Sequence, residues 1–198
     1  MIKTIDNFDF KGKKALIRVD YNVPLDSNLN ITDDKRIVES LPTIKKILSD
    51  GGMAILMSHL GRPKGTRVDE MSLRPVANYL SNELNTKVYF AEDCNSEIAK
   101  KVVSEAKSGE VVLLENLRYY AEEEANDDDF ASNLASLGDV YVNDAFGTAH
   151  RAHASTFAVA KKFDNRFAGK LIEKEIEYLE DVVNNAKRPF TAIIGGAK

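Results

Sequence analysis

Four arginines lie in, or just after, loops that follow apolar runs, and together they could hold an anion. They are Arg36, Arg62, Arg118 and Arg151. A guanidinium group is planar and always charged, and its fork of donors matches the oxygens of a carboxylate or a phosphate. Four such groups that converge without a ligand would repel one another. The set therefore predicts a small polyanionic ligand, such as a carbon acid that carries a phosphate group.

Other polar side chains near the same strand ends could orient such a ligand. Asp20 could hold a hydroxyl or a guanidinium group, and Asn22 could donate to an oxyanion. His59 and His150 could add positive charge or a neutral N–H donor. For His153, capping of local backbone and ligand contact are equally good interpretations.

The elements that must position these side chains are short apolar runs. They are Ala15–Ile17, Met53–Met57, Val111–Leu114 and Val140–Val142, with Lys87–Ala91 as a further strand. Continuous apolar runs are typical of strands in a buried parallel sheet. Ligands bind to open α/β sheets in the crevice outside the carboxyl ends of the strands. Arg18 lies within the first strand, so we expect it to form a structural ion pair, with Asp20 as a possible partner.

Segments with helical spacing of apolar residues separate the strands, which is the pattern of an α/β protein. We expect Thr32 to cap the first helix and Ser72 to cap the second, because both residue types are favoured at that position. Pro42 should kink the first helix. Ser155 is expected to cap a short helix that ends at Lys162.

The last thirty or so residues have a different organisation. Gly169 to Lys187 predicts one long amphipathic helix, with apolar residues along one stripe. Phe190–Ile194 predicts a strand that leads into Gly195–Lys198, where the chain stops. A strand followed by two glycines and a lysine resembles the opening of a phosphate-binding loop. We therefore expect the chain to be cut at the start of a second domain.

Composition restricts the class of protein. The chain has 198 residues, 43% of them hydrophobic and 29% charged, and its net charge is −4. Binding to nucleic acid is not expected, because neutralising phosphates needs a basic surface. The apolar runs are far too short for a membrane span. Cys94 is the only cysteine, which excludes an internal disulfide and favours a reducing cytosol. With no cysteine cluster and only three histidines, a structural zinc site is not expected.

Three further features have simple structural interpretations. The acidic run Glu122–Asp129 is expected to be a solvated approach to a helix and not a metal site, because its carboxylates lack the spacing of a calcium loop. Tyr119 and Tyr120 should pack or anchor a loop. Cys94 should be inert, since no basic partner is visible beside it.

Five motifs carry a family resemblance. They are Arg18–Pro24, His59–Gly65, Leu114–Arg118, Phe146–His153 and Ala192–Lys198. Together they resemble the phosphoglycerate kinase family, in the family's order and over the whole chain, although members of that family are much longer. Five separate motifs are far more specific than one glycine-rich loop.

Pattern and resemblance together predict an α/β fold of three αβα layers with a mainly parallel, roughly six-stranded, Rossmann-like sheet. The truncated start of a second α/β domain would follow. Residues 1–168 would form the N-terminal domain that binds 3-phosphoglycerate. Residues 169–188 would be the interdomain helix, and residues 189–198 the start of the nucleotide-binding C-terminal domain.

The resemblance implies an enzyme of glycolysis, a phosphotransferase that uses a carboxyl group as acceptor. Its reaction is the reversible phosphoryl transfer between 1,3-bisphosphoglycerate and ADP that gives 3-phosphoglycerate and ATP. Mg²⁺ would be bound with ATP or ADP in the full-length enzyme, and no cofactor is expected in this chain alone. We expect a cytoplasmic monomer without nucleic-acid or membrane partners. This chain should bind 3-phosphoglycerate and be essentially inactive, because ADP or ATP would bind through the missing domain.

The resemblance also assigns roles to individual residues. Asp20 and Asn22 would contact the glycerate end of the substrate, and Arg36 would face its carboxyl group and stabilise the transferring phosphoryl group. The basic patch around the 3-phosphate would be His59, Arg62, Arg118 and Arg151.

On the nucleotide side, the resemblance assigns Gly195, Gly196 and Lys198, of which Lys198 would reach the transferring phosphate. Arg36 and Lys198 would then be the two catalytic residues. The residues alone leave two other classes open. One is a non-catalytic anion-binding module. The other is an isomerase of sugar phosphates, which would need His59, His150 or Asp20 as a base.

Overall fold

A parallel sheet forms the centre of the computed structural model, which describes residues 2–184, 188–191, 193 and 195. Its six strands have the order β3-β4-β2-β1-β5-β6, and every neighbouring pair is parallel. The strands are β1 (Lys14–Val19), β2 (Met53–Met57), β3 (Val88–Ala91), β4 (Val111–Leu114), β5 (Val140–Asp144) and β6 (Arg166–Ala168). The predicted parallel α/β sheet is confirmed.

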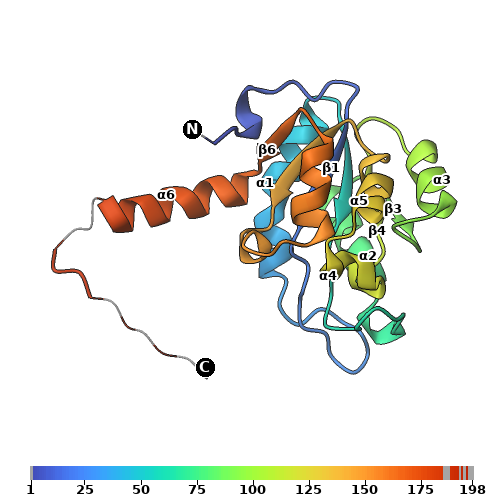
Figure 1. The fold of residues 1–198 in the computed structure, drawn as a ribbon, viewed down its shortest axis with the longest axis horizontal. Helices are drawn as coiled ribbons and strands as arrows, with labels where there is room; N and C mark the ends of the chain where they lie inside the picture. The colour runs from blue at the N-terminus through green and yellow to red at the C-terminus, as the bar shows by residue number, and fades with distance from the viewer. Residues whose placement is uncertain (1, 185–187, 192, 194, 196–198) are drawn as a thin grey trace.

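Helices cover both faces of this sheet (Figure 1). The α-helices are α1 (Lys35–Ser49), α2 (Arg74–Leu84), α3 (Glu97–Glu105), α4 (Ala121–Ala125), α5 (Asp128–Ala135) and α6 (Lys170–Asn184). Shorter 3-10 turns are η1 (Ile5–Asn7), η2 (Asp69–Met71), η3 (Leu117–Tyr119), η4 (Phe146–Thr148) and η6 (Val159–Lys162), and η5 (Ala154–Ala158) is a π-helix. Among the described residues, no helix is both long and apolar enough to cross a membrane.

Alternation along the strands divides the core into two layers. Successive side chains of a strand point to opposite faces. Ile17 and Leu56 pack on one side with α1 and α2. Leu16 and Ile55 pack on the other side with α3 and α5. All four side chains are fully buried, so the sheet is covered on both faces and the three predicted layers are present.

The sequence missed one strand and predicted another that is not observed. β6 has only three residues, pairs with β5 at the edge of the sheet, and has no apolar run that would reveal it. Within the predicted strand Phe190–Ile194, the described residues Phe190, Thr191 and Ile193 have no strand structure, whereas 192 and 194 lie outside the described residues.

Two of the predicted helix caps are wrong. Asp34, and not Thr32, occupies the N-cap position of α1, and the Thr32 hydroxyl donates to the carbonyl of Pro24 at 3.2 Å. Ser155 lies inside η5, where His153 is the N-cap residue and forms a capping box with Thr156. The backbone N–H of His153 donates to the Thr156 hydroxyl at 3.3 Å, so its position agrees with the capping interpretation, whereas ligand contact stays a prediction.

The other two helix predictions have different outcomes. At α2 the N-cap position belongs to Leu73 and not to Ser72, although the Ser72 hydroxyl does accept the N–H of Arg74 at 3.2 Å. α1 runs through Pro42 without ending.

The predicted amphipathic helix corresponds to α6, and its apolar stripe is only partly covered. Ile172 near its start is buried against the body of the protein. Leu179 and Val183, further along the same stripe, are exposed, because the helix extends away from the sheet (Figure 1). Residues 185–187 of the predicted range lie outside the described residues.

Candidate anion-binding site

The register of the sheet brings four strand-end loops to one edge. β4, β2, β1 and β5 are consecutive in the sheet, and Arg18 of β1 lies beside Met57 of β2 and Asn143 of β5. The loops after these strands therefore start side by side. The backbone N–H of Tyr21 donates to the Ser58 hydroxyl at 2.8 Å, which links the first two loops. This is the edge at which the sequence predicts a ligand.

His59 lies at the centre of the basic groups at this edge. Its side chain is buried, with the residue only 5% exposed, and Arg18 Nη2 lies 3.1 Å from its Nδ1. Burial lowers the pKa of His59 from its usual value to about 2, and the charges of Arg18, Arg118, Arg151 and Arg36 lower it further in that order. We call this group of five residues the His59 basin. It unites three of the four predicted arginines, from three separate segments of the chain.

Arg118 is held rigidly within the basin. Its side chain is 6% exposed, its Nη1 donates to the carbonyl of Gly61 at 2.9 Å, and its Nε lies 3.3 Å from Glu124 Oε1. Burial is the main cause that lowers the pKa of Arg118, and Glu124 opposes it. The side chain of Asn116 fixes the same loop, because it donates to the carbonyls of Leu60 and Met71 at 2.7 and 2.9 Å.

Asn22 positions the loop that carries Arg62. Asn22 Oδ1 accepts the N–H of Gly61 at 2.8 Å, so its amide N–H groups remain available as donors. Gly61 has a φ of 65°, which favours glycine, and a Cβ there would lie 2.7 Å from the sulfur of Met71, so a larger residue would strain the loop and displace Met71. Arg62 follows directly and is exposed, and within the described residues it has no ion pair.

Asp20 forms an ion pair with Arg36, which lies in the first turn of α1. Of the two partners considered for Asp20, the structure therefore shows the guanidinium. The Arg36 side chain is 52% exposed and borders a cavity of about 450 Å³. That cavity is also lined by Phe146 and Gly147 of η4 and by residues of α6. Arg36 thus stands at the mouth of the basin, toward α6.

Arg18 is structural, as predicted, but its hydrogen-bond partners are not those expected. It is 1% exposed, its Nε donates to Ser155 Oγ at 2.9 Å, and Nη1 donates to the carbonyl of Val19. Asp20 contributes only a longer-range electrostatic interaction. The predicted direct pairing with Asp20 is therefore corrected to a hydrogen-bonded network.

Glu123 is the main residue that the sequence interpretation missed. The solvated interpretation of the run Glu122–Asp129 is wrong at this position, because Glu123 is only 1% exposed. Its carboxylate accepts the N–H of Ser155 at 2.9 Å and the hydroxyl of Ser155 at 2.5 Å. The partner is 32 residues away in sequence, so no local pattern could reveal this contact.

The predictions for the tyrosines and the cysteine are confirmed. The hydroxyl of Tyr119 donates to the carbonyl of Val68 at 2.6 Å, and that of Tyr120 donates to Asp93 at 2.8 Å, so both anchor loops. Burial raises the pKa of the Cys94 thiol, which disfavours the reactive thiolate.

Comparison with known proteins decides the family. A family model described as phosphoglycerate kinase matches residues 5–198. The chain belongs to the phosphoglycerate kinase family.

Individual relatives agree with this assignment. The phosphoglycerate kinase of Chlorobium chlorochromatii (strain CaD3) is 57% identical over 197 residues, which are 99% of this chain and 49% of that protein. The solved structure of phosphoglycerate kinase from Coxiella burnetii superposes with a TM-score of 0.84 at 38% identity, over 96% of this chain and 47% of that one. The enzyme from Pyrococcus horikoshii OT3 gives a TM-score of 0.86 at 33% identity, over 95% and 47%. The chain spans about half the length of the relatives that it matches.

The remaining predicted residues lie outside the basin or outside the described residues. His150 is exposed, in the loop between η4 and η5. Gly195 is exposed, and a Cβ at that position would meet no atom within 4 Å. Gly196 and Lys198, which the resemblance assigns to the nucleotide, fall outside the described residues.

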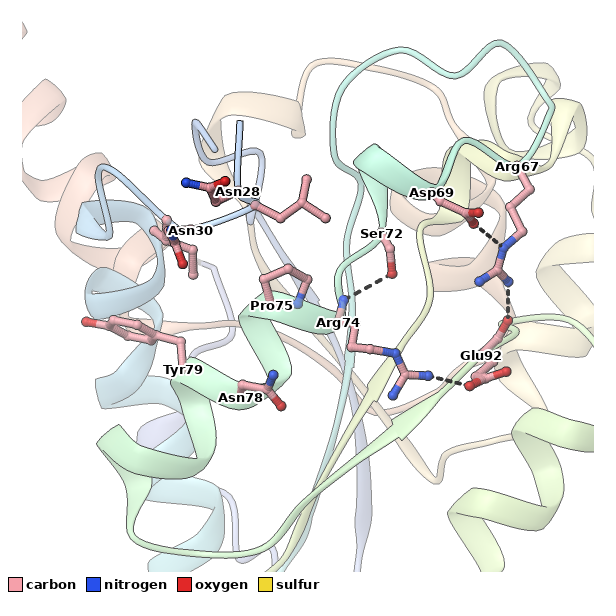
Figure 2. A pocket seen from close by; sticks show the side chains of 12 residues that line it. Asn28, Asn30, Arg67, Asp69, Ser72, Arg74, Pro75, Asn78, Tyr79 and Glu92 are labelled. Carbon is pink, nitrogen blue, oxygen red and sulfur yellow. Dashed lines mark hydrogen bonds and ion pairs between the residues drawn. The ribbon is translucent and has the colours of Figure 1, made fainter. Parts of the chain in front are cut away.

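A larger cavity of about 770 Å³ lies elsewhere, beside the start of α2, and none of the predicted site residues lines it. We call it the α2 cavity; its rim carries Arg67, Asp69, Arg74, Tyr79 and Glu92 (Figure 2). Each guanidinium there is already paired with a carboxylate: Arg67 Nε lies 3.1 Å from Asp69 Oδ1, and Arg74 forms an ion pair with Glu92. The larger cavity therefore has no excess of positive charge with which to hold an anion.

Proposed function

We propose that this chain provides the 3-phosphoglycerate side of a phosphoglycerate kinase. The proposed reaction is the reversible transfer of a phosphoryl group between 1,3-bisphosphoglycerate and ADP, which yields 3-phosphoglycerate and ATP in glycolysis. Membership of the family supports this proposal. The observation that carries it is that three of the predicted arginines, Arg36, Arg118 and Arg151, act electrostatically on the buried imidazole of His59.

The charge of the basin suits a substrate with an acid at each end. Within the described residues, Arg151 of the basin has no ion pair, and neither has Arg62, which follows the Gly61 that Arg118 contacts. The site therefore has positive charge in excess. A phosphate monoester carries about −1.5 to −2 charge at neutral pH, and a carboxylate adds one more negative charge. The 3-phosphate would lie among His59, Arg62, Arg118 and Arg151.

Arg36 would meet the carboxyl end of the substrate at the mouth of the basin. Asp20 orients Arg36 through their ion pair, and Asn22 has free N–H donors for the glycerate oxygens. These assignments make Arg36 a catalytic residue, because charge would develop at the carboxyl end during transfer.

The chemistry needs positioning and charge neutralisation more than proton transfer. The attacking group is already an anion in either direction, as a carboxylate or as an oxygen of ADP, so no general base is required. Phosphoryl transfer is catalysed almost entirely by positioning and by electrostatic stabilisation. Arg36 and, from the nucleotide side, Lys198 would stabilise the same developing charge. Closure about α6 would exclude water from the acyl phosphate.

The rival isomerase hypothesis lacks a suitable base. His59 Nδ1 already accepts from Arg18, and the pKa of about 2 makes the imidazole a poor proton acceptor. Asp20 is paired with Arg36, and His150 is exposed outside the basin. A non-catalytic anion-binding module would use the same basin and differs only in turnover.

The proposed reaction also needs a nucleotide and Mg²⁺, which would bind outside the His59 basin. ADP or ATP would contact Gly195, Gly196 and Lys198, and Mg²⁺ would neutralise its phosphates. Among the described residues, no group of three or more His, Cys, Asp or Glu side chains could hold a metal ion, so none of them is assigned to Mg²⁺. We place the protein in the cytoplasm as a monomer. Alone, the 198 residues should show essentially no turnover, since their proposed nucleotide contacts are limited to the last few positions.

The test is a titration of the 198-residue chain with 3-phosphoglycerate, followed by NMR at the side chains of His59 and Arg36. We expect both sets of resonances to move together and to saturate at millimolar ligand. Glycerate, which lacks the phosphate, is the matched control and should perturb Arg36 more than His59. No perturbation of either residue at millimolar 3-phosphoglycerate would contradict the proposal.

A further inference from the structure

Behind the His59 basin, a chain of buried hydrogen bonds connects helix α4 with the imidazole. Glu123 of α4 accepts from the Ser155 hydroxyl at 2.5 Å, Ser155 Oγ accepts from Arg18 Nε at 2.9 Å, and Arg18 Nη2 lies 3.1 Å from His59 Nδ1. Glu123, Ser155 and Arg18 are each at most 1% exposed, and they come from three distant segments of the chain. The proposed reaction gives no role to Glu123 or Ser155, and Arg18 enters it only as one charge of the basin.

The donor and acceptor roles along this chain follow from the chemistry of its two ends. A guanidinium group has only donors, so His59 Nδ1 must accept the bond from Arg18. At the other end a carboxylate accepts both the N–H and the hydroxyl of Ser155. The single hydroxyl proton of Ser155 therefore points to Glu123, which leaves its oxygen lone pair for Arg18. The donor and the acceptor of every hydrogen bond between Glu123 and His59 are thus determined.

This direction determines the tautomer of His59. If Nδ1 is an acceptor, the one proton of the neutral imidazole lies on Nε2. Nε2 has no hydrogen-bond partner among the described residues, and it is not one of the fully buried polar atoms that lack a partner. It therefore reaches solvent at the basin as an N–H donor.

We propose that Glu123, Ser155 and Arg18 are positioning residues that hold His59 as the neutral Nε2–H tautomer, ready to donate to an oxygen of an anionic ligand. The opposite tautomer would present a lone pair to that oxygen and repel it. The proposal rests on the proposed function only for the identity of the ligand, 3-phosphoglycerate.

The charges around the imidazole agree with this assignment. Arg18 from β1, Arg36 from α1, Arg118 from η3 and Arg151 from the loop before η5 all act electrostatically on His59. A positive charge on the ring would be repelled by all four of them. Neutral His59 can still supply one directed hydrogen bond where the arginines supply charge.

The first measurement needs no variant and no ligand. Long-range ¹⁵N–¹H correlation spectra of the 198-residue chain at neutral pH report which imidazole nitrogen carries the proton. We expect a protonated Nε2 and an unprotonated Nδ1 for His59. A proton on Nδ1, or an imidazolium ion with both nitrogens protonated, would overturn the proposal.

The second measurement breaks the chain of hydrogen bonds. Ser155→Ala removes the hydroxyl between Glu123 and Arg18, and Glu123→Gln removes the carboxylate. We expect both tautomers of His59 to appear and the Kd for 3-phosphoglycerate to rise about tenfold, the scale of one hydrogen bond to a charged group. Glu122→Gln is the matched control, since Glu122 is the exposed neighbour with the same change of charge, and it should alter neither readout.

Amide spectra first establish that each variant is folded. A folded Ser155→Ala variant with an unchanged tautomer and an unchanged Kd would refute the positioning role of these hydrogen bonds. If both variants unfold, the tautomer of the unmodified chain still decides the assignment. The two proposals also fail separately: an Nε2–H tautomer without 3-phosphoglycerate binding refutes the proposed function, whereas binding with the wrong tautomer refutes only the positioning role.

Discussion

The His59 basin and the α2 cavity both contain arginines, yet they differ in how those arginines are paired. In the α2 cavity, Arg67 and Arg74 each have a carboxylate partner, Asp69 and Glu92. Around the basin, Arg36 and Arg118 have such partners in Asp20 and Glu124. Arg62 and Arg151, however, have no ion pair within the described part of the chain.

The larger cavity is therefore the poorer candidate for an anion site. Its volume is about 770 Å³, compared with about 450 Å³ for the cavity beside Arg36. Volume measures the space for a ligand, whereas affinity for a small anion depends on positive charge that no protein carboxylate has already neutralised. The comparison teaches that the balance of charges, and not the size of the hollow, locates the site.

The strongest test of this difference between the two regions is to remove one unpaired guanidinium group. Arg151→Met should raise the Kd for 3-phosphoglycerate about 30-fold, because hydrogen bonds to charged groups contribute about 1.5–3 kcal/mol. Isothermal titration calorimetry measures the change. Arg74→Met, in the α2 cavity, is the matched control and should change the Kd less than about twofold. Equal losses in the two variants would show that the basin has no special role.

Acid stability should also separate the two regions. Burial and four guanidinium groups lower the pKa of His59 from 6.5 to about 2. Its contribution to stability is thus fully present above pH 6.5 and decreases as the pH falls toward 2, since only the unfolded chain then binds the proton. His59→Gln should reduce the loss of unfolding free energy between pH 6.5 and pH 4 by about 1–2 kcal/mol, measured by urea denaturation.

The control for that measurement lies in the α2 cavity. Tyr79 has a pKa of about 12, because its hydroxyl donates to Asp34, so it does not titrate in acid. Tyr79→Phe should keep the full acid sensitivity of the unmodified chain. If His59→Gln keeps it as well, His59 is not the source of the effect.

The dependence of ligand binding on salt concentration should also distinguish the basin from the α2 cavity, with a smaller effect. Raising the ionic strength from about 0.05 M to 0.5 M shortens the screening length to a few ångströms, so 3-phosphoglycerate binding should weaken about fivefold. Arg151→Met should show a shallower dependence, since it has lost one interacting charge. Arg74→Met should show the same dependence as the unmodified chain. Parallel slopes for all three proteins would contradict an excess of charge at Arg151.

Sequence alone predicted the architecture because its signals are local. Continuous apolar runs mark the five longer strands, and apolar residues at helical spacing mark the helices between them. β6 was missed because Arg166–Ala168 is a short edge strand whose pairing depends on β5. The sequence predicts the N-cap of α1 at Thr32, whereas the structure has it at Asp34. Several residues before Lys35 favour that position equally well, so the sequence could not distinguish them.

The sequence predicted part of the site, namely which arginines come together, but not every buried residue behind them. Parallel strands that are neighbours in a sheet place their carboxyl ends together, so the convergence of Arg36, Arg118 and Arg151 near His59 followed from the strand pattern. Burial of Glu123 did not follow, because its neighbours in sequence are charged and its partner Ser155 comes from another segment. The binding roles of all these residues stay predictions until a ligand is titrated.

The smallest effect concerns the α2 cavity itself. Tyr79→Phe removes the 2.7 Å hydrogen bond between the hydroxyl and Asp34, which joins α2 to the residue before α1. Because this bond is exposed to water, we expect a loss of only about 0.5 kcal/mol in unfolding free energy, measured by urea denaturation at pH 7. The Kd for 3-phosphoglycerate should stay the same, since the hydroxyl belongs to the α2 cavity and not to the basin. A Kd raised severalfold by this one oxygen atom would mean that the two regions are coupled through α1, and the contrast between them would have to be abandoned.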